Sequence, residues 1–399
     1  MRRSLKDLRQ IPNMAFCASF VAAALIAAGC GSSGGSTSAA SSSNSTSANP
    51  QLAEAKQALA AAEAIPQFKL EAAKFDASKA KGKTLFIIPI ATSDEFAAEI
   101  DSEMATVAKQ LGVKTVVFNN QGSPTEWAQG INQAISAKAS VIAMVAGGDP
   151  TLVMPQLEQA KSAGIPAIIV NYYDYEEVPQ KVKEVMGGFV QGPFHEAGKL
   201  MADYAAKQTN GKPHPLIVTA AEAAPSAGMV KSIQTELKQL CASCGSKVVN
   251  VPVADWPTKM QSTVESALIS DPEINYVLPL YDSMAIGAQA GLTAAGKVGK
   301  APIASYNGTP AVLKLIQDGH IMQMDAGENT NWIAYAAMDQ VLRLLSGVPV
   351  VPDGVNNERL PLRVFNGSNV GETGTPPTGG KGYGEQYVVG YDKLWGIAP

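Results

Sequence analysis

Aromatic rings and short polar groups gather directly after apolar, strand-length runs in this sequence, where they could bind a small molecule. The pattern follows five separate runs, in a chain whose aromatic content is only 6%. Flat rings beside hydrogen-bonding side chains suit a solute that has flat faces and a polar rim. The residues concerned are Asp94, Phe96, Asn171, Tyr172, Trp256, Tyr281, Tyr306 and Asn307.

Some polar residues in these places have a simpler explanation. Asp282 and Thr309 each stand where a helical pattern begins, and Pro310 follows Thr309. Short polar side chains are preferred at helix N-caps, and proline is favoured in the first turn. We therefore interpret Asp282 and Thr309 as capping residues, and we favour ligand contact for Trp256, Tyr281 and Tyr306.

The elements that position these residues alternate between strands and helices. Runs that are apolar on both faces, separated by helical patterns, predict a parallel sheet covered on both sides. Ligands of such sheets bind beyond the carboxyl ends of the strands. The chain is too long for one sheet core, so we expect two domains, with a glycine-containing hinge at 186–204. The strand-like runs are 84–90, 114–119, 140–146, 166–171, 215–220, 247–253, 274–280, 301–305 and 320–326.

The combination and order of five segments resemble a known family. These segments are 162–171, 197–207, 254–261, 271–297 and 305–310. They are similar to the type I periplasmic solute-binding proteins of ABC importers, the branch that includes ribose- and galactose-binding proteins and the effector domains of lactose-repressor-type regulators. The resemblance covers roughly residues 82–365.

The resemblance implies an α/β fold of two doubly wound parallel-sheet lobes, joined by three crossings of the chain and closing around a ligand. It implies an N-terminal lobe of 81–190 plus 328–357. The C-terminal lobe would hold 191–327 plus 358–399, including an extended tail. The tail begins as a loop by composition and ends in a strand-like run at 387–395.

The resemblance also adds Lys231 and Glu328 to the expected site. It places Asn171 and Asn307 where family members carry acids, and this chain lacks the arginines of sugar-binding members. Carboxylates and arginine forks give strong hydrogen bonds to sugar hydroxyls. We therefore expect a neutral, sugar-like solute, with a non-sugar cyclic or aromatic metabolite as the alternative.

The N-terminus has the features of an export signal. Basic residues, a short apolar run at 14–28 and small residues precede Cys30, which resembles a bacterial lipoprotein signal. We expect residues 1–29 to be a signal peptide and Cys30 to carry lipid, although an ordinary secretory signal remains the alternative. Residues 30–80 read as a flexible tether and stalk, whose Ser/Gly-rich part cannot bury enough surface to fold.

Cys241 and Cys244 are expected to form a structural disulfide, since the protein would fold outside the cytoplasm. A redox-active pair normally begins a helix, where the thiol pKa is lowered, whereas this pair follows a helical pattern. The chain has only three histidines, which argues against a zinc site. We predict no metal and no cofactor.

Composition and motifs exclude other classes of function. A net charge of −4 gives no electrostatic footprint for nucleic acid. Catalytic and phosphate-binding motifs are missing or wrongly placed, so we predict a binding protein and not an enzyme. We expect a lipid-anchored monomer on the extracytoplasmic face of the cell membrane, which binds a small solute and delivers it to ABC permease subunits. The alternative is a ligand-sensing subunit for a chemoreceptor or sensor kinase.

Overall fold

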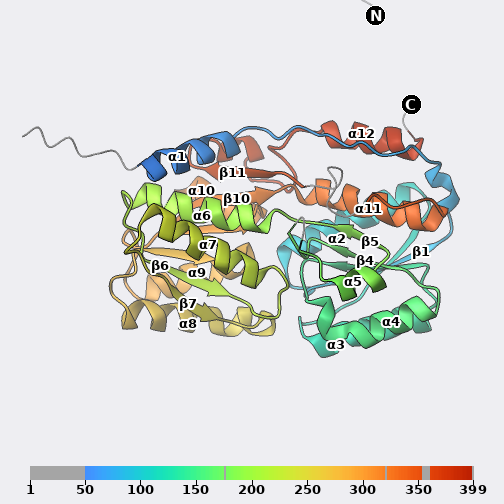
Figure 1. The fold of residues 1–399 in the computed structure, drawn as a ribbon, viewed down its shortest axis with the longest axis horizontal. Helices are drawn as coiled ribbons and strands as arrows, with labels where there is room; N and C mark the ends of the chain where they lie inside the picture. Colours follow the sequence, from blue (N-terminus) through green and yellow to red (C-terminus); the bar gives the residue numbers. More distant parts are fainter. Residues whose placement is uncertain (1–49, 175–176, 320, 353–359, 398–399) are drawn as a thin grey trace, which may run out of the picture. The chain divides into compact units, whose positions relative to one another are not determined.

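The computed structural model describes residues 50–174, 177–319, 321–352 and 360–397, which belong to one compact unit. The predicted signal peptide, Cys30 and the Ser/Gly-rich part of the tether lie outside the described residues. The described chain forms two β-sheets with helices packed on them (Figure 1). The predicted fold class, two parallel-sheet α/β lobes, is confirmed.

The first lobe is built on a five-stranded sheet in the order β2-β1-β3-β4-β5, in which every neighbouring pair is parallel. Its central strands are buried along their length, because both faces are covered by helices. The strands are β1 (Thr84–Pro89), β2 (Lys114–Val117), β3 (Val141–Val145), β4 (Ala167–Val170) and β5 (Gly188–Val190). The helices are α2 (Glu95–Gln110), α3 (Pro124–Ser136), α4 (Met154–Ser162), α5 (Gln180–Val185) and α11 (Thr330–Ser346).

The second lobe is built on a six-stranded sheet in the order β11-β10-β9-β8-β6-β7. Its pairs are parallel except for the edge strand β11, which runs antiparallel to β10. The strands are β6 (Pro215–Thr219), β7 (Lys247–Asn250), β8 (Tyr276–Pro279), β9 (Ile303–Asn307), β10 (Met322–Glu328) and β11 (Leu362–Asn366). The helices are α6 (Phe194–Gln208), α7 (Ser226–Leu240), α8 (Trp256–Ser270), α9 (Asp282–Ala294) and α10 (Pro310–Asp318).

The chain passes between the lobes after β5, after β10 and again between α11 and β11. The expected hinge segment 186–204 contains two regular elements, β5 and most of α6, so the first crossing itself is only the short link 191–193. After β10 the chain enters α11, which packs against α2, β3, β4 and β5 of the first lobe. Glu328, the last residue of β10, therefore stands at a crossing point.

The N-terminal segment from residue 50 differs from the predicted stalk. It forms α1 (Pro50–Ala62), which packs on α6, α7 and β11, and Leu59 is buried in the main hydrophobic core. Downstream, the Phe68 ring contacts Trp332 and Tyr391 at centroid distances of 5.5 and 5.4 Å. The apolar face of α1 is weak but complementary to α6, and a weak face is easily mistaken for a solvated one.

The C-terminal end also differs from its prediction. The strand-like run 387–395 is a helix, α12 (Gln386–Trp395), and it lies on α11 of the first lobe (Figure 1). Tyr387 stacks on Trp332 with ring centroids 5.2 Å apart, and Trp395 Nε1 donates to Asp339 Oδ1 at 2.8 Å. The aromatic and β-branched residues of this run predicted a strand, but tertiary packing on α11 stabilises a helix instead.

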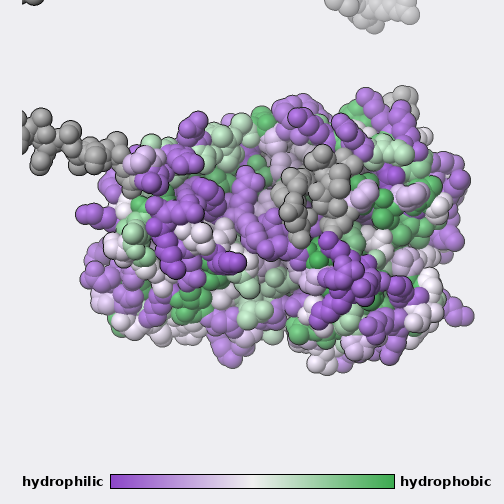
Figure 2. Space-filling model, viewed as in Figure 1, coloured by the Kyte–Doolittle hydropathy of each residue, from purple (hydrophilic) through white to green (hydrophobic). Residues whose placement is uncertain are grey.

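Cys241 and Cys244 form a disulfide directly after α7, where the sequence placed the end of a helix. The face seen in Figure 2 is mostly hydrophilic, with scattered apolar areas. Within the described ranges, no helix has both the length and the apolar character needed to cross a bilayer.

The packing of α1 can be tested at Leu59, whose side chain is 1% exposed. Replacing it with alanine should lower the free energy of unfolding by about 3 kcal/mol, since a buried leucine is truncated. The control is Leu52→Ala on the same helix, where a half-buried side chain predicts a loss of about 1 kcal/mol. Urea unfolding followed by tryptophan fluorescence measures both. A negligible loss of unfolding free energy in both variants would contradict the packing of α1 and would favour the predicted stalk.

Candidate functional site

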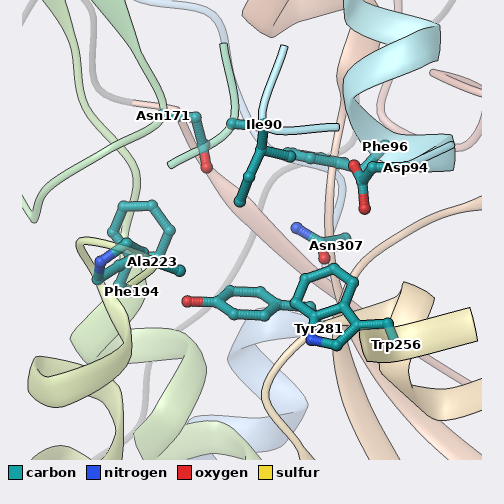
Figure 3. A pocket seen from close by; sticks show the side chains of 11 residues that line it. Ile90, Asp94, Phe96, Asn171, Phe194, Ala223, Trp256, Tyr281 and Asn307 are labelled. Carbon is teal, nitrogen blue, oxygen red and sulfur yellow. The ribbon is translucent and has the colours of Figure 1, made fainter. Parts of the chain in front are cut away.

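A cavity lies where the carboxyl ends of strands from both sheets meet. Its empty volume, open solvent at the mouth included, is about 330 Å³. The positions follow β1, β3, β4 and β5 in the first sheet and β6, β7, β8 and β9 in the second, as expected for parallel sheets. The lining residues are Ile90, Asp94, Phe96, Ala146, Asn171, Phe194, Ala223, Pro225, Trp256, Tyr281 and Asn307 (Figure 3).

Six of the ten residues predicted for the site line this cavity. They are Asp94, Phe96, Asn171, Trp256, Tyr281 and Asn307. Tyr172, Tyr306 and Glu328 are buried but do not line it. Lys231 is exposed on α7 and lines a different surface cleft, so its expected place in the site is wrong.

The aromatic wall of the cavity is held in place by its own contacts. Trp256 and Tyr281 have ring centroids 6.0 Å apart and lie on one side of the cavity (Figure 3). Trp256 Nε1 donates to the carbonyl oxygen of Val251 at 2.9 Å, and the Tyr281 hydroxyl is 2.9 Å from Ser226 Oγ. Because their polar atoms are engaged, these two rings present mainly apolar faces to a ligand.

Asp94 connects the first lobe to the second at the edge of the cavity. Its Oδ1 accepts from the Ala97 amide at 2.8 Å and so caps α2. Its Oδ2 accepts from Ser283 Oγ, at the start of α9, at 2.7 Å. Burial raises the pKa of Asp94, and both hydrogen bonds oppose that rise.

Asn171 is oriented by a carboxylate behind it. Its Nδ2 donates to Glu328 Oε2 at 2.8 Å, and the Tyr306 hydroxyl donates to the same oxygen. The Asn171 carbonyl oxygen is thereby directed into the cavity (Figure 3). Burial raises the pKa of Glu328 to about 7, although the two hydrogen bonds lower it.

Asn307 supplies the complementary donor. Its Oδ1 accepts from the Asp282 amide at 3.3 Å, which leaves its Nδ2 turned toward the cavity (Figure 3). The Asp282 carboxylate in turn accepts hydrogen bonds from the Ser305 hydroxyl and from the amide and hydroxyl of Thr309. The predicted capping role is wrong for both side chains: Asp282 is the first residue of α9, Thr309 stands at the N-cap of α10, and neither side chain makes a capping hydrogen bond in its own helix. Both residues support Asn307 instead, through the hydrogen bonds between Thr309 and Asp282. The site offers an amide acceptor, an amide donor and one carboxylate.

The backbone around the cavity is strained at three non-glycine residues. Ala146, Asn171 and Asn307 have φ values of 66°, 63° and 146°. Residues held in such conformations cost free energy, and they cluster at ligand-binding sites, where the surrounding structure fixes them. All three follow or end strands that lead into the cavity.

The lobes touch each other across the cavity mouth. Gly148 and Ala223 form a β-bridge, and the Ala224 amide donates to the Gly147 carbonyl at 2.7 Å. With the Ser283–Asp94 hydrogen bond, these contacts define a closed arrangement of the lobes.

Five lining residues were missed in the sequence. They are Ile90, Ala146, Phe194, Ala223 and Pro225. Ile90 and Ala146 are the last residues of the expected runs 84–90 and 140–146, and they directly follow β1 and β3 in the structure, so the strand-end rule could have found them. Phe194 follows β5, a strand that was not expected. Ala223 and Pro225 resemble ordinary loop residues, and nothing in their type marks them.

A larger surface cleft lies along α6 and α7, with an empty volume of about 1080 Å³ that includes open solvent. Lys199 in this cleft already pairs with Asp203 and Glu236 at 2.9 and 3.2 Å. This cleft lies on helix surfaces and not at strand ends, so we take the smaller cavity as the candidate site. In the described part of the chain, no group of three or more His, Cys, Asp or Glu side chains is arranged to hold a metal ion.

The fold and this cavity define a two-lobed binding protein, and comparison with known proteins identifies its family. Residues 84–349, well over half of the chain, match the model of a periplasmic binding protein domain. The chain therefore belongs to the periplasmic binding protein family. The similar proteins described next are solute-binding proteins and not enzymes, in agreement with the prediction from the sequence.

Three similar proteins illustrate the range of the match. The chain is 24% identical over 215 residues to a D-ribose/D-allose-binding protein of Pseudomonas aeruginosa, covering 51% of this chain and 63% of that protein. It is 28% identical over 223 residues to a D-apiose import binding protein of Actinobacillus succinogenes, covering 54% and 67%. A solved ABC transporter solute-binding protein from Agrobacterium vitis with bound allitol has a TM-score of 0.62 at 20% identity, covering 73% of this chain and 98% of that one.

Glu328 makes a testable contribution to stability. Its pKa is raised in the folded protein, so the folded state holds a proton that the unfolded state has released between about pH 4.5 and 7. Stability from this group is present at low pH and is lost as the pH rises through that window, on the order of 3 kcal/mol in total. Glu328→Gln lacks the charge. In urea titrations, the free energy of unfolding of the variant should therefore rise relative to that of the wild type between pH 4.5 and pH 8. A difference between the two proteins that does not change with pH would contradict the raised pKa of Glu328.

Proposed function

We propose that this protein is the solute-binding component of an ABC importer, and that it captures a small, neutral, sugar-like solute between its lobes and delivers it to the permease. The observation that carries the proposal is the strand-end cavity between two lobes in closed contact. Family membership and the sugars named for its relatives support the same reading.

The chemistry of the cavity favours a neutral solute. Among the residues that the structure describes, no lysine or arginine lines it, and Asp94 would repel an anion. The rings of Phe96, Phe194, Trp256 and Tyr281 can pack against the C–H face of a sugar or against a flat ring. A phosphorylated or multiply anionic solute therefore fits poorly.

The cavity also favours a solute with few hydroxyl groups. Each of its three polar side chains already uses part of its hydrogen-bonding capacity on the protein: Asp94 on Ala97 and Ser283, Asn171 on Glu328, and Asn307 on Asp282. A fully hydroxylated hexose would leave several buried hydroxyls unpaired, and each would cost free energy. A pentose, a deoxy sugar or a compact polyol fits better, and a non-sugar cyclic metabolite remains the second candidate.

A thermal-shift screen tests the proposal directly. The panel should contain D-ribose, D-allose, D-apiose, allitol, deoxy sugars, nucleosides and aromatic acids. A solute at a hundred times its Kd stabilises the folded state by about 2.7 kcal/mol, which raises Tm by several degrees. We expect a hit among the neutral sugars or polyols. Hits confined to aromatic acids would favour the second candidate, and a panel without any hit would contradict a sugar-like ligand.

Trp256 should contribute to affinity for the hit. A stacked, partly buried indole is worth on the order of 1–3 kcal/mol, so Trp256→Ala should bind the hit about tenfold or more weakly in isothermal titration calorimetry. Trp256→Phe keeps a ring in place and should stay within about threefold of the wild type. Equal affinity in the wild type and Trp256→Ala would show that the ligand binds elsewhere.

We also propose that the protein is anchored by lipid on Cys30 and held on the extracytoplasmic face of the cell membrane. The basic leader, the short apolar run and the small residues before Cys30 support this reading. Cells grown with radiolabelled palmitate should label the protein, and Cys30→Ala should abolish the label. Cys17→Ala is the matched control and should retain it, because Cys17 lies in the part to be removed. Label that survives Cys30→Ala would refute the anchor.

A further inference from the structure

The C-terminal segment 367–385 lies outside the family match, which ends at residue 349, yet it packs against the wall of the cavity. It follows β11 and is tied to the second lobe: Gln317 Nε2 donates to the Gly374 carbonyl at 2.7 Å, and Arg363 donates to the Gly382 carbonyl. Within the segment, the Thr378 amide donates to the Thr373 carbonyl at 3.0 Å. The segment is therefore an ordered part of the second lobe.

Tyr383 is the residue of this segment that reaches the ends of β9 and β10. Its side chain is 1% exposed, and its ring meets Phe365 edge-on, with centroids 5.2 Å apart. Its hydroxyl lies against Gly308 and Gly327. A Cβ at position 308 would stand 2.7 Å from that hydroxyl, and a Cβ at position 327 would overlap it.

Glycine is required at these two positions for different physical reasons. Gly308 has a φ of 80°, so its backbone alone disfavours a side chain. Gly327 is not among the positive-φ residues, so any residue could adopt its backbone conformation. Only the neighbouring rings, with the Tyr383 hydroxyl nearest, require glycine at 327. Tyr383 thus fills the space that a side chain at 327 would occupy.

Each glycine adjoins a residue that shapes the cavity. Gly308 follows Asn307, which lines the cavity with its amide nitrogen toward it. Gly327 precedes Glu328, which orients Asn171 from behind. Tyr383 therefore contacts the backbone next to both supports of the polar rim, one residue behind the surface that meets the ligand.

We propose that Tyr383 is a positioning residue for the solute site: it fixes the ends of β9 and β10 so that Asn307 and the Asn171–Glu328 pair face the ligand. The proposal rests on the function proposed above. The Tyr383 hydroxyl is the nearest atom to both glycines, but among the described residues nothing hydrogen-bonds to it, so it acts by packing and the ring supplies most of the packed volume. Tyr383→Phe should therefore keep most of the support, and Tyr383→Ala should remove it.

The control is Tyr391→Ala. Tyr391 belongs to the same C-terminal extension and is also buried, but its ring packs on Phe68, Tyr335 and Trp395, and none of these residues is among the nearest neighbours of a Cβ at either glycine. Both alanine variants lose a buried ring and should melt earlier than the wild type. A merely structural role for Tyr383 would make the two variants alike in ligand binding.

The experiment measures binding of D-ribose, D-apiose and 2-deoxy-D-ribose to the full-length variants by isothermal titration calorimetry, at a temperature where circular dichroism shows each variant folded. Tyr383→Ala should lose about tenfold or more in affinity, which is the size of effect measured when a group that orients a metal ligand is removed. Tyr383→Phe and Tyr391→Ala should stay within about threefold of the wild type. Equal affinities for Tyr383→Ala and the wild type, or equal losses in both alanine variants, would overturn the proposal.

Amide hydrogen exchange decides the case without a ligand. The Asp282 amide donates to Asn307 and the Thr309 amide donates to Asp282, so both report on the end of β9. In Tyr383→Ala these amides should exchange faster than in the wild type, and in Tyr391→Ala they should not. If the wild type binds none of the three probes, the proposed ligand class fails, and the exchange rates alone support or refute the role of Tyr383.

Discussion

The carboxylate of Glu328 is the interaction on which the arrangement of the site depends. It is fully buried, stands where β10 crosses to α11, and accepts hydrogen bonds from Asn171 of the first lobe and Tyr306 of the second. A buried carboxylate is expensive unless it is paired with donors. The two donors offset that cost and are fixed by it, so one group sets the orientation of residues from both sheets.

The strand-end geometry and the segments outside the family match complement each other. Parallel strands bring the ends of both sheets to one cavity, and the closed contacts at Gly148 and Ala223 cover it. On the other side, α1 packs on the second lobe, while the chain after it contacts α12 through the Phe75 amide and the Leu394 carbonyl, 2.8 Å apart. The N- and C-terminal extensions thus pack on a core of two lobes that already contact each other at the strand-end cavity.

Much of the fold could be predicted from the sequence, because apolar runs and helical patterns alternate so regularly. The runs at 84–90 and 140–146 became β1 and β3 with little change in their bounds. Strand β5 was missed because three residues give no pattern, and β11 because it lies in a segment without alternation. Helix α12 was misread because its rings pack on α11, which no local pattern reveals.

The strand-end rule led to six residues that line the cavity, but it does not decide the direction of every side chain. Successive residues of a strand point to opposite sides, so with Asn307 of β9 facing the cavity, Tyr306 faces away from it. Alternation does not apply to Tyr172, because Asn171 before it has a left-handed backbone conformation. The prediction of Lys231 failed because the cavity is lined by Ala223 and Pro225, which precede α7. Lys231 lies within the helix and is exposed. The contributions of Glu328 and Tyr383 act through neighbours, and such support is visible only in three dimensions.

The central claim is that ligand binds in the strand-end cavity between the lobes. A crystal structure of the complex with the tightest-binding neutral sugar or polyol tests it most directly. We expect ligand density against the Trp256 and Tyr281 rings, within hydrogen-bond distance of Asn171 and Asn307. Ligand density in the cleft along α6 and α7, with the strand-end cavity filled only by protein and water, would contradict the account.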